Sequence, residues 1–308
     1  MTLTTPAGRA SYTERAARLH EQPLHAAGPQ PGFVSGTAQS VRDIWAYREL
    51  LGLLVRRELK ARYKDSTLGF FWSLMRPLSQ LVIYYVALGK FLGAERQIPD
   101  YAIFVFTGLT GWQLYSEIVS SCTGSIVANG GLVKKIYLPR EVFPLSMVGA
   151  ALFNFVVQLS ILVLATLLVG KPPTGRNLLY IPLALIVLLL WATAAGFLLG
   201  AVNVYLRDVQ YLVEILLMVL FWTAPTVYSW EQVHRVLGDG LLGKIYDLNP
   251  LTNIILAFQR AFWVAGHGKP GPPHIWLNLL LLAALGSVLL WLGQRIFSKL
   301  QNDFAQEL

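Results

Sequence analysis

The chain has 308 residues, of which 55% are hydrophobic and only 14% are charged, and its mean hydropathy is +0.51. These values lie well outside the range of soluble globular domains and indicate an integral membrane protein. The net charge of +8 would suit a nucleic-acid partner, but the cations gather in short loops beside apolar segments, which is the pattern of membrane topology. We therefore expect no nucleic acid among the partners.

The N-terminal part divides into a tail and a surface helix. Residues 1–41 are rich in Pro, Gly, Ala and Gln, which predicts a disordered cytoplasmic tail. Residues 42–66 are expected to form an amphipathic interfacial helix, although Leu53 and Arg62 depart from its pattern. Its apolar face comprises Ile44, Tyr47, Leu51, Leu54 and Val55. Its basic face comprises Arg56, Arg57, Lys60 and Lys64. Such a helix lies on a bilayer, where the cations anchor it or guide an anionic lipid head group.

Residues 67–308 are expected to form a transmembrane domain, because several apolar stretches exceed the roughly 20 residues that a helix needs to cross a membrane. We predict six spanning helices, at residues 68–92, 101–122, 142–169, 178–204, 211–229 and 275–297. The first contains Arg76 and Lys90, whose long side chains can reach opposite head-group layers. Cations are denser at the span ends on the side of the surface helix, which predicts a plasma (inner) membrane protein with both termini cytoplasmic.

Residues 251–264, between the fifth and sixth spans, form an apolar stretch that is too short to cross the membrane. The turn signal Asn249-Pro250 should begin this helix, and Gly266 should end it. A re-entrant or interfacial helix and an external helix packed on the bundle both fit this pattern.

The sequence lacks the motifs of several common functional sites. No GxxxxGK[ST] motif occurs, so we expect no ATP site. The five histidines and the single Cys122 lack ligand spacing, so we expect no metal site. Two acids, Glu117 and Glu214, fall within predicted spans, where an ionisable group suggests a function. Without partner cations they would make a poor proton relay, and we expect both near helix ends, capping or pairing with loop residues.

Three segments, in order along the chain, carry a resemblance to a known family. They are RYKDSTLGFFWSLMRPL at 62–78, FTGLTGWQLYSEIVSSCTGSIVANGGLVKKIYLPREVFPL at 106–145, and NVYLRDVQYLV at 203–213. Together they resemble the membrane subunit of ABC-2 type exporters, and more narrowly the branch that moves O-antigen, capsule, teichoic acid and galactan polymers. The resemblance begins at about residue 42 and implies the all-α ABC-2 type exporter fold.

The resemblance also implies partners and sites. Two copies of the chain would form a homodimer, and each would dock a separate ABC ATPase subunit that holds ATP and Mg²⁺. Two cytoplasmic loops, 125–138 and 205–211, suit the role of coupling segments. Their docking residues would be Ile126, Val127, Leu132, Val133, Lys134, Lys135, Arg140, Arg207 and Asp208. The first and fifth spans would line the pore, with Tyr84, Tyr85, Phe221 and Trp222 as candidates for glycan contact. An interfacial aromatic belt is the alternative for such residues.

These expectations together predict the permease subunit of an ATP-driven exporter of a lipid-linked polysaccharide, with no catalytic residues of its own. Export of a drug or small lipid on the same fold is the alternative. A membrane-embedded glycosyltransferase would need a cluster of acids or a histidine facing the membrane surface, and the sequence offers none.

Overall fold

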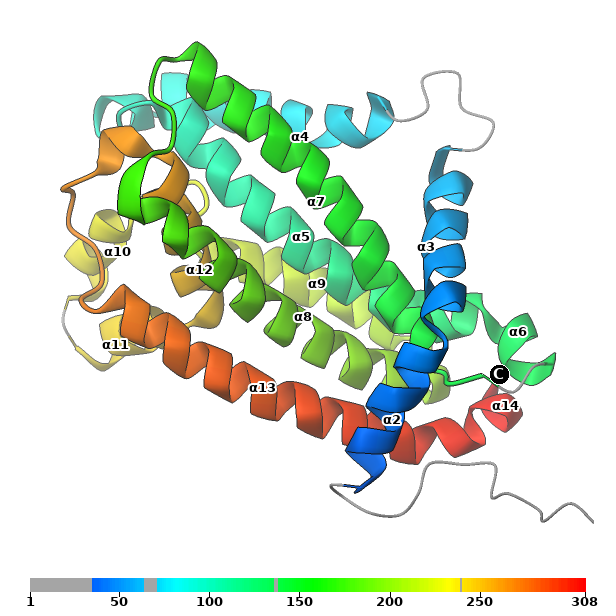
Figure 1. Ribbon diagram of the computed structural model, residues 1–308. Coiled ribbons are helices and arrows are strands. Elements are labelled where there is room, and N and C mark those ends of the chain that lie inside the picture. The colour runs from blue at the N-terminus through cyan, green and yellow to red at the C-terminus, as the bar shows by residue number, and fades with distance from the viewer. Residues whose placement is uncertain (1–34, 64–70, 136–137, 239) are drawn as a thin grey trace, which may run out of the picture.

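The computed structural model describes residues 35–63, 71–135, 138–238 and 240–308, and within these ranges the chain forms helices and no strand (Figure 1). The all-α prediction is confirmed. We call one end of the helical bundle the basal end; it carries α3 (Arg48–Tyr63), α6 (Gly130–Lys135) and α14 (Phe304–Glu307). The opposite end, with α10 (Trp230–Leu237) and α11 (Leu241–Leu248), is the distal end.

Four long helices make up the centre of the bundle: α5 (Tyr101–Ala128), α7 (Val142–Leu168), α8 (Tyr180–Tyr205) and α13 (Ile275–Leu300). α8 packs against both α5 and α13, and α5 packs against α7. Glycines on α8 allow a close approach to α5. A Cβ atom added at Gly200 would lie 2.9 Å from the carbonyl oxygen of Cys122, and one added at Gly196 would lie 2.6 Å from the Cys122 Cβ atom. Such small residues are typical of helix contacts inside membranes.

Within the described part of the chain, three segments are long and apolar enough to cross a membrane: Val142–Leu168, Gly175–Tyr205 and Ile275–Glu307. They coincide with the third, fourth and sixth predicted spans. The second predicted span corresponds to α5 and the fifth to the shorter α9 (Val209–Thr223). The first corresponds to α4 (Phe71–Tyr84) and the π-helix η1 (Tyr85–Phe91) that follows it. The count of six crossings stays a prediction.

The predicted surface helix is divided into two helices, α2 (Ser35–Ala46) and α3. Residues 35–41, which we assigned to the tail, form the start of α2; residues 1–34 of the tail lie outside the described part of the chain. Near the junction, the Arg48 Nη1 atom donates to the carbonyl oxygen of Trp45 at 3.2 Å. α3 crosses α7, with Leu54 buried and Val55 against Gly149. This part of the apolar face therefore contacts protein, whereas we expected it to reach the acyl boundary.

The short apolar segment forms α12 (Pro250–Phe262). The expected start is confirmed, because Asn249 caps the helix by accepting a hydrogen bond from the Leu251 N–H at 3.0 Å, and Pro250 takes the first helical position. α12 packs on α5, α8 and α13, and its residues 251–259 are all buried. A re-entrant path through the hydrocarbon stays a prediction.

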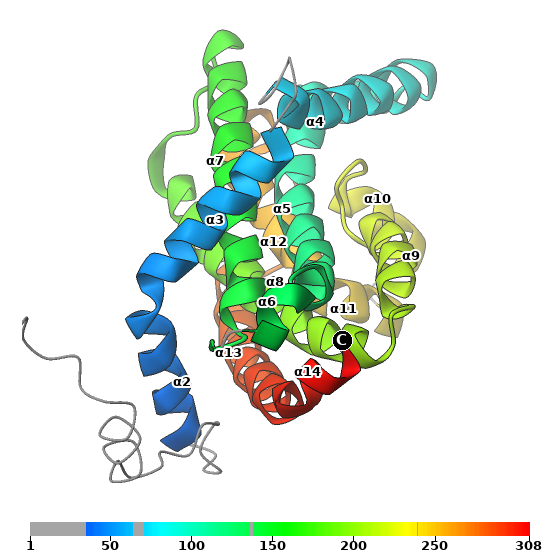
Figure 2. The ribbon, with the colours of Figure 1, turned by 90° about the vertical axis from the view of Figure 1, so that its right-hand side faces the viewer.

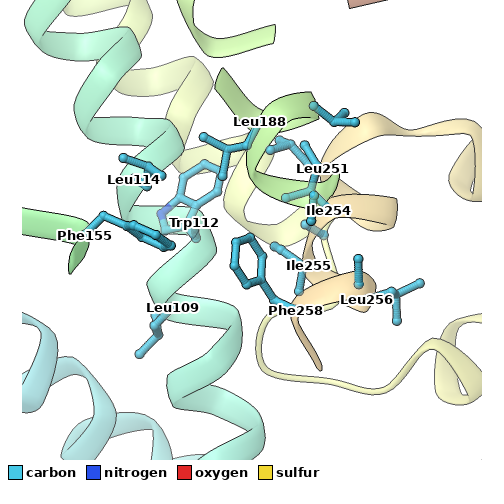
Figure 3. Packing of buried hydrophobic residues seen from close by; sticks show 14 of the residues in the cluster. Leu109, Trp112, Leu114, Phe155, Leu188, Leu251, Ile254, Ile255, Leu256 and Phe258 are labelled. Carbon is cyan, nitrogen blue, oxygen red and sulfur yellow. The ribbon is translucent and has the colours of Figure 1, made fainter. Parts of the chain in front are cut away.

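The buried apolar side chains form two clusters. The larger one joins α5, α7, α8 and α12, and Figure 3 shows Trp112, Phe155 and Phe258 within it. The smaller one, the basal cluster, comprises Leu54, Ile126, Val133, Val142, Phe143, Phe197, Ala201, Val204, Phe297 and Phe304. The basal cluster joins α3, α6 and α14 to the long helices, so α3 and the C-terminal α14 are both packed into the base of the bundle.

Candidate functional site

A cavity of about 1030 Å³ lies between α4, α5 and α9. Figure 2 shows α4 and α9 on the same side of α5, away from α7. The polar lining comprises Arg62, Arg76, Gln80, Gln113, Ser116, Glu117, Ser120, Ser121, Asn154, Gln158 and Glu214. The apolar lining comprises Pro77, Tyr84, Trp112, Leu217, Met218, Phe221 and Trp222. Many polar groups facing one hollow between apolar helices mark a candidate ligand path.

One wall of this cavity is aromatic. The ring of Tyr84, from α4, stacks on Phe221, from α9, with centroids 5.7 Å apart. Trp112, from α5, meets Phe221 edge-on at 5.5 Å, and Trp222 meets it edge-on at 5.3 Å. Three predicted aromatic residues therefore line the cavity, and the sequence reasoning missed Trp112. The fourth, Tyr85, is not part of the lining; its ring lies 5.3 Å from the Lys90 ammonium.

The basal part of the cavity holds an ion pair between Arg62, at the end of α3, and Glu117 of α5. The Asn154 Nδ2 atom on α7 donates to Glu117 Oε1 at 2.7 Å. A carboxylate away from water needs such partners, because an unpaired charge in a membrane interior is costly. We name these three residues the polar clamp. It joins α3, α5 and α7 at the rim of the cavity.

The polar clamp corrects two sequence interpretations. Glu117 lies near the middle of α5 and not at a helix end, so it cannot act as a cap. Arg62, which departed from the amphipathic pattern, is its partner. An acid in an apolar span and a cation on an apolar face were the two signals that could have found the pair. Glu214 also lies towards the middle of its helix, as the sixth of the 15 residues of α9, and it lines the cavity, so the expected position near a helix end is wrong for it as well.

Towards the distal end, a second hollow adjoins the cavity. It has a volume of about 830 Å³ and a mainly apolar lining, and it lies beside α10 and α11. Its lining includes Trp222, Val236, Leu242 and Ile245. Trp222 lines both hollows, so they are neighbours along α9. We name the second hollow the apolar groove.

The basic face of α3 is partly exposed and partly bonded. Arg56 and Lys60 are exposed, and Lys64 lies outside the described residues. The Arg57 Nη2 atom donates to Glu58 Oε1 at 2.5 Å and to Asn129 Oδ1, at the end of α5, at 2.6 Å. α3 therefore contacts two separate places. Arg57 bonds it to the junction of α5 and α6, and Arg62 bonds it to the wall of the cavity.

The predicted coupling segments are only partly available for docking. Ile126 and Val133 are buried in the basal cluster, and Val127 and Leu132 pack against it. The expectation that Ile126 and Val133 meet a partner subunit is wrong, because Phe304 and Leu308 of the chain's own C-terminus occupy this region. Arg140 is half-buried, with its guanidinium 5.9 Å from the Phe304 ring centroid.

The charged members of the coupling segments remain at the surface. Lys134 and Lys135 are exposed at the end of α6, and Arg207 and Asp208 are exposed between α8 and α9. The Arg207 Nη2 atom lies 3.5 Å from the carbonyl oxygen of Leu308, so both segments adjoin the C-terminus. The exposed part of the two segments therefore combines charged side chains with apolar ones, since Leu206, next to Arg207, is 62% exposed.

Comparison with known proteins agrees with this architecture. Residues 49–263 match the family described as ABC-2 type transporter. An O-antigen export system permease protein of Myxococcus xanthus is 31% identical over 268 residues, which are 87% of this chain and 98% of the relative. A Klebsiella pneumoniae protein of the same name is 29% identical over 84% of this chain and 95% of its own length. A polysialic acid transport protein of Escherichia coli is 24% identical over 79% of this chain and 90% of its own length. The chain therefore belongs to the ABC-2 type transporter family, as a membrane-embedded transport component.

Proposed function

We propose that this chain is the permease subunit of an ATP-driven exporter that moves a lipid-linked polysaccharide, such as an O-antigen, galactan or teichoic-acid-like polymer, across the plasma membrane. The observation that carries the proposal is the cavity between α4, α5 and α9, whose lining combines an aromatic wall with amides, hydroxyls and the charged side chains of Arg62, Arg76, Glu117 and Glu214. The names of the relatives, which refer to O-antigen export and polysialic acid transport, support the same substrate class.

The cavity lining suits a polymer that must slide. Sugar rings present apolar C–H faces, which pack on aromatic rings such as Tyr84 and Phe221 without a fixed pattern of hydrogen bonds. Their hydroxyls can exchange hydrogen bonds with neutral groups such as Gln80 and Gln113, whose amides bond to each other, with Gln113 Nε2 donating to Gln80 Oε1 at 2.8 Å. Neutral partners give specificity without the tight grip of a charge-assisted bond.

The assembly we propose is a homodimer with two ABC ATPase subunits. The side of α9 that does not line the cavity is apolar and exposed at Leu212, Leu216 and Val219, so a second copy or lipid must cover it. A second copy facing α4 and α9 would close the cavity into a path. The chain has no P-loop, so ATP and Mg²⁺ would be held by the partner subunits.

Partner subunits would dock at the basal end, on the exposed cations Lys134, Lys135 and Arg207. α3 would transmit their movement, because it is bonded to the α5–α6 junction through Arg57 and to the cavity through Arg62. This arrangement puts the basal end and both termini in the cytoplasm, and the distal end outside.

Export of a drug or small lipid is the alternative function, and the apolar groove beside α10 and α11 is the observation that favours it. The polar lining of the larger cavity favours the polymer, because an apolar substrate would leave those groups without hydrogen bonds.

Trp222→Ala tests the proposed function in cells that depend on this chain for surface glycan. Trp222 lines both hollows and is 53% exposed, so its loss should reduce export while the protein still folds. Tyr211→Ala is the matched control, since Tyr211 is on the same helix, is 68% exposed and does not line the cavity. We expect less surface glycan with Trp222→Ala than with Tyr211→Ala at equal membrane levels. Unchanged glycan after depletion of the chain, together with lost drug resistance, would instead establish the alternative.

A further inference from the structure

A third hollow, separate from the cavity and the groove, lies at the distal end and has a volume of about 300 Å³. It is built by the end of α12, the loop that follows it, and Asn177 of the 3-10 helix η3 (Gly175–Leu179). Its lining includes Arg260, Trp263, His267 and Lys269. We name it the distal pocket. None of the described residues that line it carries a carboxylate.

The two cations of the distal pocket have only neutral partners. Arg260 is half-buried; its Nη1 atom lies 3.4 Å from the Tyr180 hydroxyl oxygen, and its guanidinium lies 5.8 Å from the Tyr180 ring centroid. The Lys269 Nζ atom donates to the backbone carbonyl of Gln97 at 2.7 Å. Among the residues that the structure describes, no carboxylate forms an ion pair with Arg260 or Lys269.

Other cations at the same end are neutralised. Lys90 pairs with Glu95 at 2.8 Å, and Lys171 pairs with Asp100 at 2.6 Å. Other cations of this end, such as Arg96, Arg176 and Lys244, are exposed and solvated. Arg260 differs from both groups, because it is half-buried and has no acid partner. A positive charge held in this way in a concave site attracts an anion. If the distal end faces outwards, as the proposed function has it, such cations also run against the usual charge bias of membrane proteins.

The loop that follows α12 forms one wall of the distal pocket and has little conformational freedom. Gly271 passes beside the guanidinium, and a Cβ atom added there would lie 3.1 Å from Arg260 Nη2. Pro270 and Pro272 flank this glycine and restrict the loop. With its proton on Nε2, His267 donates to the carbonyl oxygen of Arg260 at 2.9 Å, which ties the loop to α12, and the same ring nitrogen lies 3.1 Å from Asn177 Nδ2 of η3.

The chemistry of these groups selects the anion. A guanidinium presents two parallel N–H donors that match the oxygens of a phosphate, and a nearby ammonium adds a second charge-assisted contact. The Trp263 indole N–H already donates to the Pro99 carbonyl at 2.6 Å, so only its ring is left as an apolar wall. The volume exceeds that of one phosphate and leaves room for a sugar or glycerol beside it. We propose that the distal pocket binds a phosphate group carried by a small organic moiety, with Arg260 and Lys269 as its two cationic ligands.

The test measures thermal unfolding of the purified full chain in detergent micelles. Inorganic phosphate, glucose 1-phosphate or phosphatidylglycerol is titrated at constant ionic strength, and a compound that binds only the folded state raises the unfolding temperature until saturation. Stabilisation by glucose 1-phosphate or inorganic phosphate would identify a soluble phosphate, and stabilisation by phosphatidylglycerol alone would identify a lipid head group. Either result supports the site, and no stabilisation by any of the three would overturn it.

Variants locate the binding. Arg260→Gln should raise the dissociation constant of the active probe by about tenfold or more, because it removes the charge-assisted bonds. Lys269→Gln should raise it by a smaller factor, and it keeps the test decisive if Arg260→Gln does not fold, since Lys269 is exposed. Lys244→Gln, an exposed cation of α11 outside the pocket, is the control and should bind like the wild type. Equal affinities in Lys269→Gln, Lys244→Gln and the wild type would refute the assignment. The readout is independent of glycan export, so it can succeed or fail separately from the proposed function.

Discussion

Glu117→Gln removes the negative charge of the polar clamp while keeping the shape of the side chain. The glutamine Oε1 atom can still accept from Asn154 Nδ2, a bond of 2.7 Å in the native protein. What is lost is the attraction between Glu117 and Arg62. The change therefore isolates the electrostatic link between α3 and the cavity wall.

The strength of the ion pair between Arg62 and Glu117 depends on how far the two side chains are exposed to solvent. The side chains of Arg62 and Glu117 are 34% and 21% exposed. Exposed pairs contribute about 0–1 kcal/mol, and breaking a fully buried pair costs about 3–5 kcal/mol. For this intermediate exposure we expect a coupling energy of about 1–2 kcal/mol between the two residues.

A double-mutant cycle measures that coupling. The free energy of unfolding is obtained for the wild type, Glu117→Gln, Arg62→Gln and the double variant, by reversible unfolding of the full chain in mixed micelles. The control cycle uses Arg235 and Glu231 on α10, which form a pair at 3.4 Å with side chains 66% and 46% exposed. We expect about 0.3–0.5 kcal/mol there, as for other exposed pairs one helical turn apart. A coupling for Arg62 and Glu117 that is no larger than this control value would refute the reasoning.

Three further predictions concern the packing and the basal surface. Gly200→Ala should lower the free energy of unfolding by about 1–3 kcal/mol, because the new methyl group meets the α5 backbone. Gly131→Ala on α6 has open space and should raise it by about 0.5–1 kcal/mol, so equal effects in the two glycine variants would contradict the helix contact. Phe304→Ala should cost about 3–5 kcal/mol, since Phe304 is fully buried in the basal cluster; a loss below 1 kcal/mol, roughly that of a surface change, would show that this cluster does not hold the C-terminus. Replacing both Lys134 and Lys135 by glutamine should weaken copurification of the proposed ATPase subunit without changing the unfolding temperature, and undiminished copurification would contradict docking at these two lysines.

Local features of this chain could be predicted from its sequence. The long apolar stretches gave the positions of α7, α8 and α13, because a helix that crosses a membrane must be apolar along its length and satisfy its own backbone. Asn249-Pro250 gave the start of α12, since capping and the fixed φ angle of proline act within one turn. The family resemblance rested on segments that agree in order and spacing, and the comparisons confirmed it.

The composition of the site depended on contacts between distant segments. Arg62 and Glu117 are separated by 55 residues in sequence. A local sequence pattern therefore cannot predict that the end of α3 contacts the middle of α5. Adjacent side chains on a helix point roughly 100° apart, so only the packing decides that Tyr84 faces the cavity while Tyr85 does not.

The same limit explains the error at the coupling segments. Ile126 and Val133 have the pattern of an exposed docking surface as long as α5 and α6 are considered alone. In the fold both residues are buried in the basal cluster, to which the C-terminal Phe304 also belongs, because buried apolar area stabilises whichever contacts the chain can form within itself. Sequence by itself determined that this is a helical membrane protein with an aromatic, partly basic entry to its first span. Only the tertiary structure decided which charges meet and which apolar residues remain available, because both depend on pairs of segments that the fold brings together.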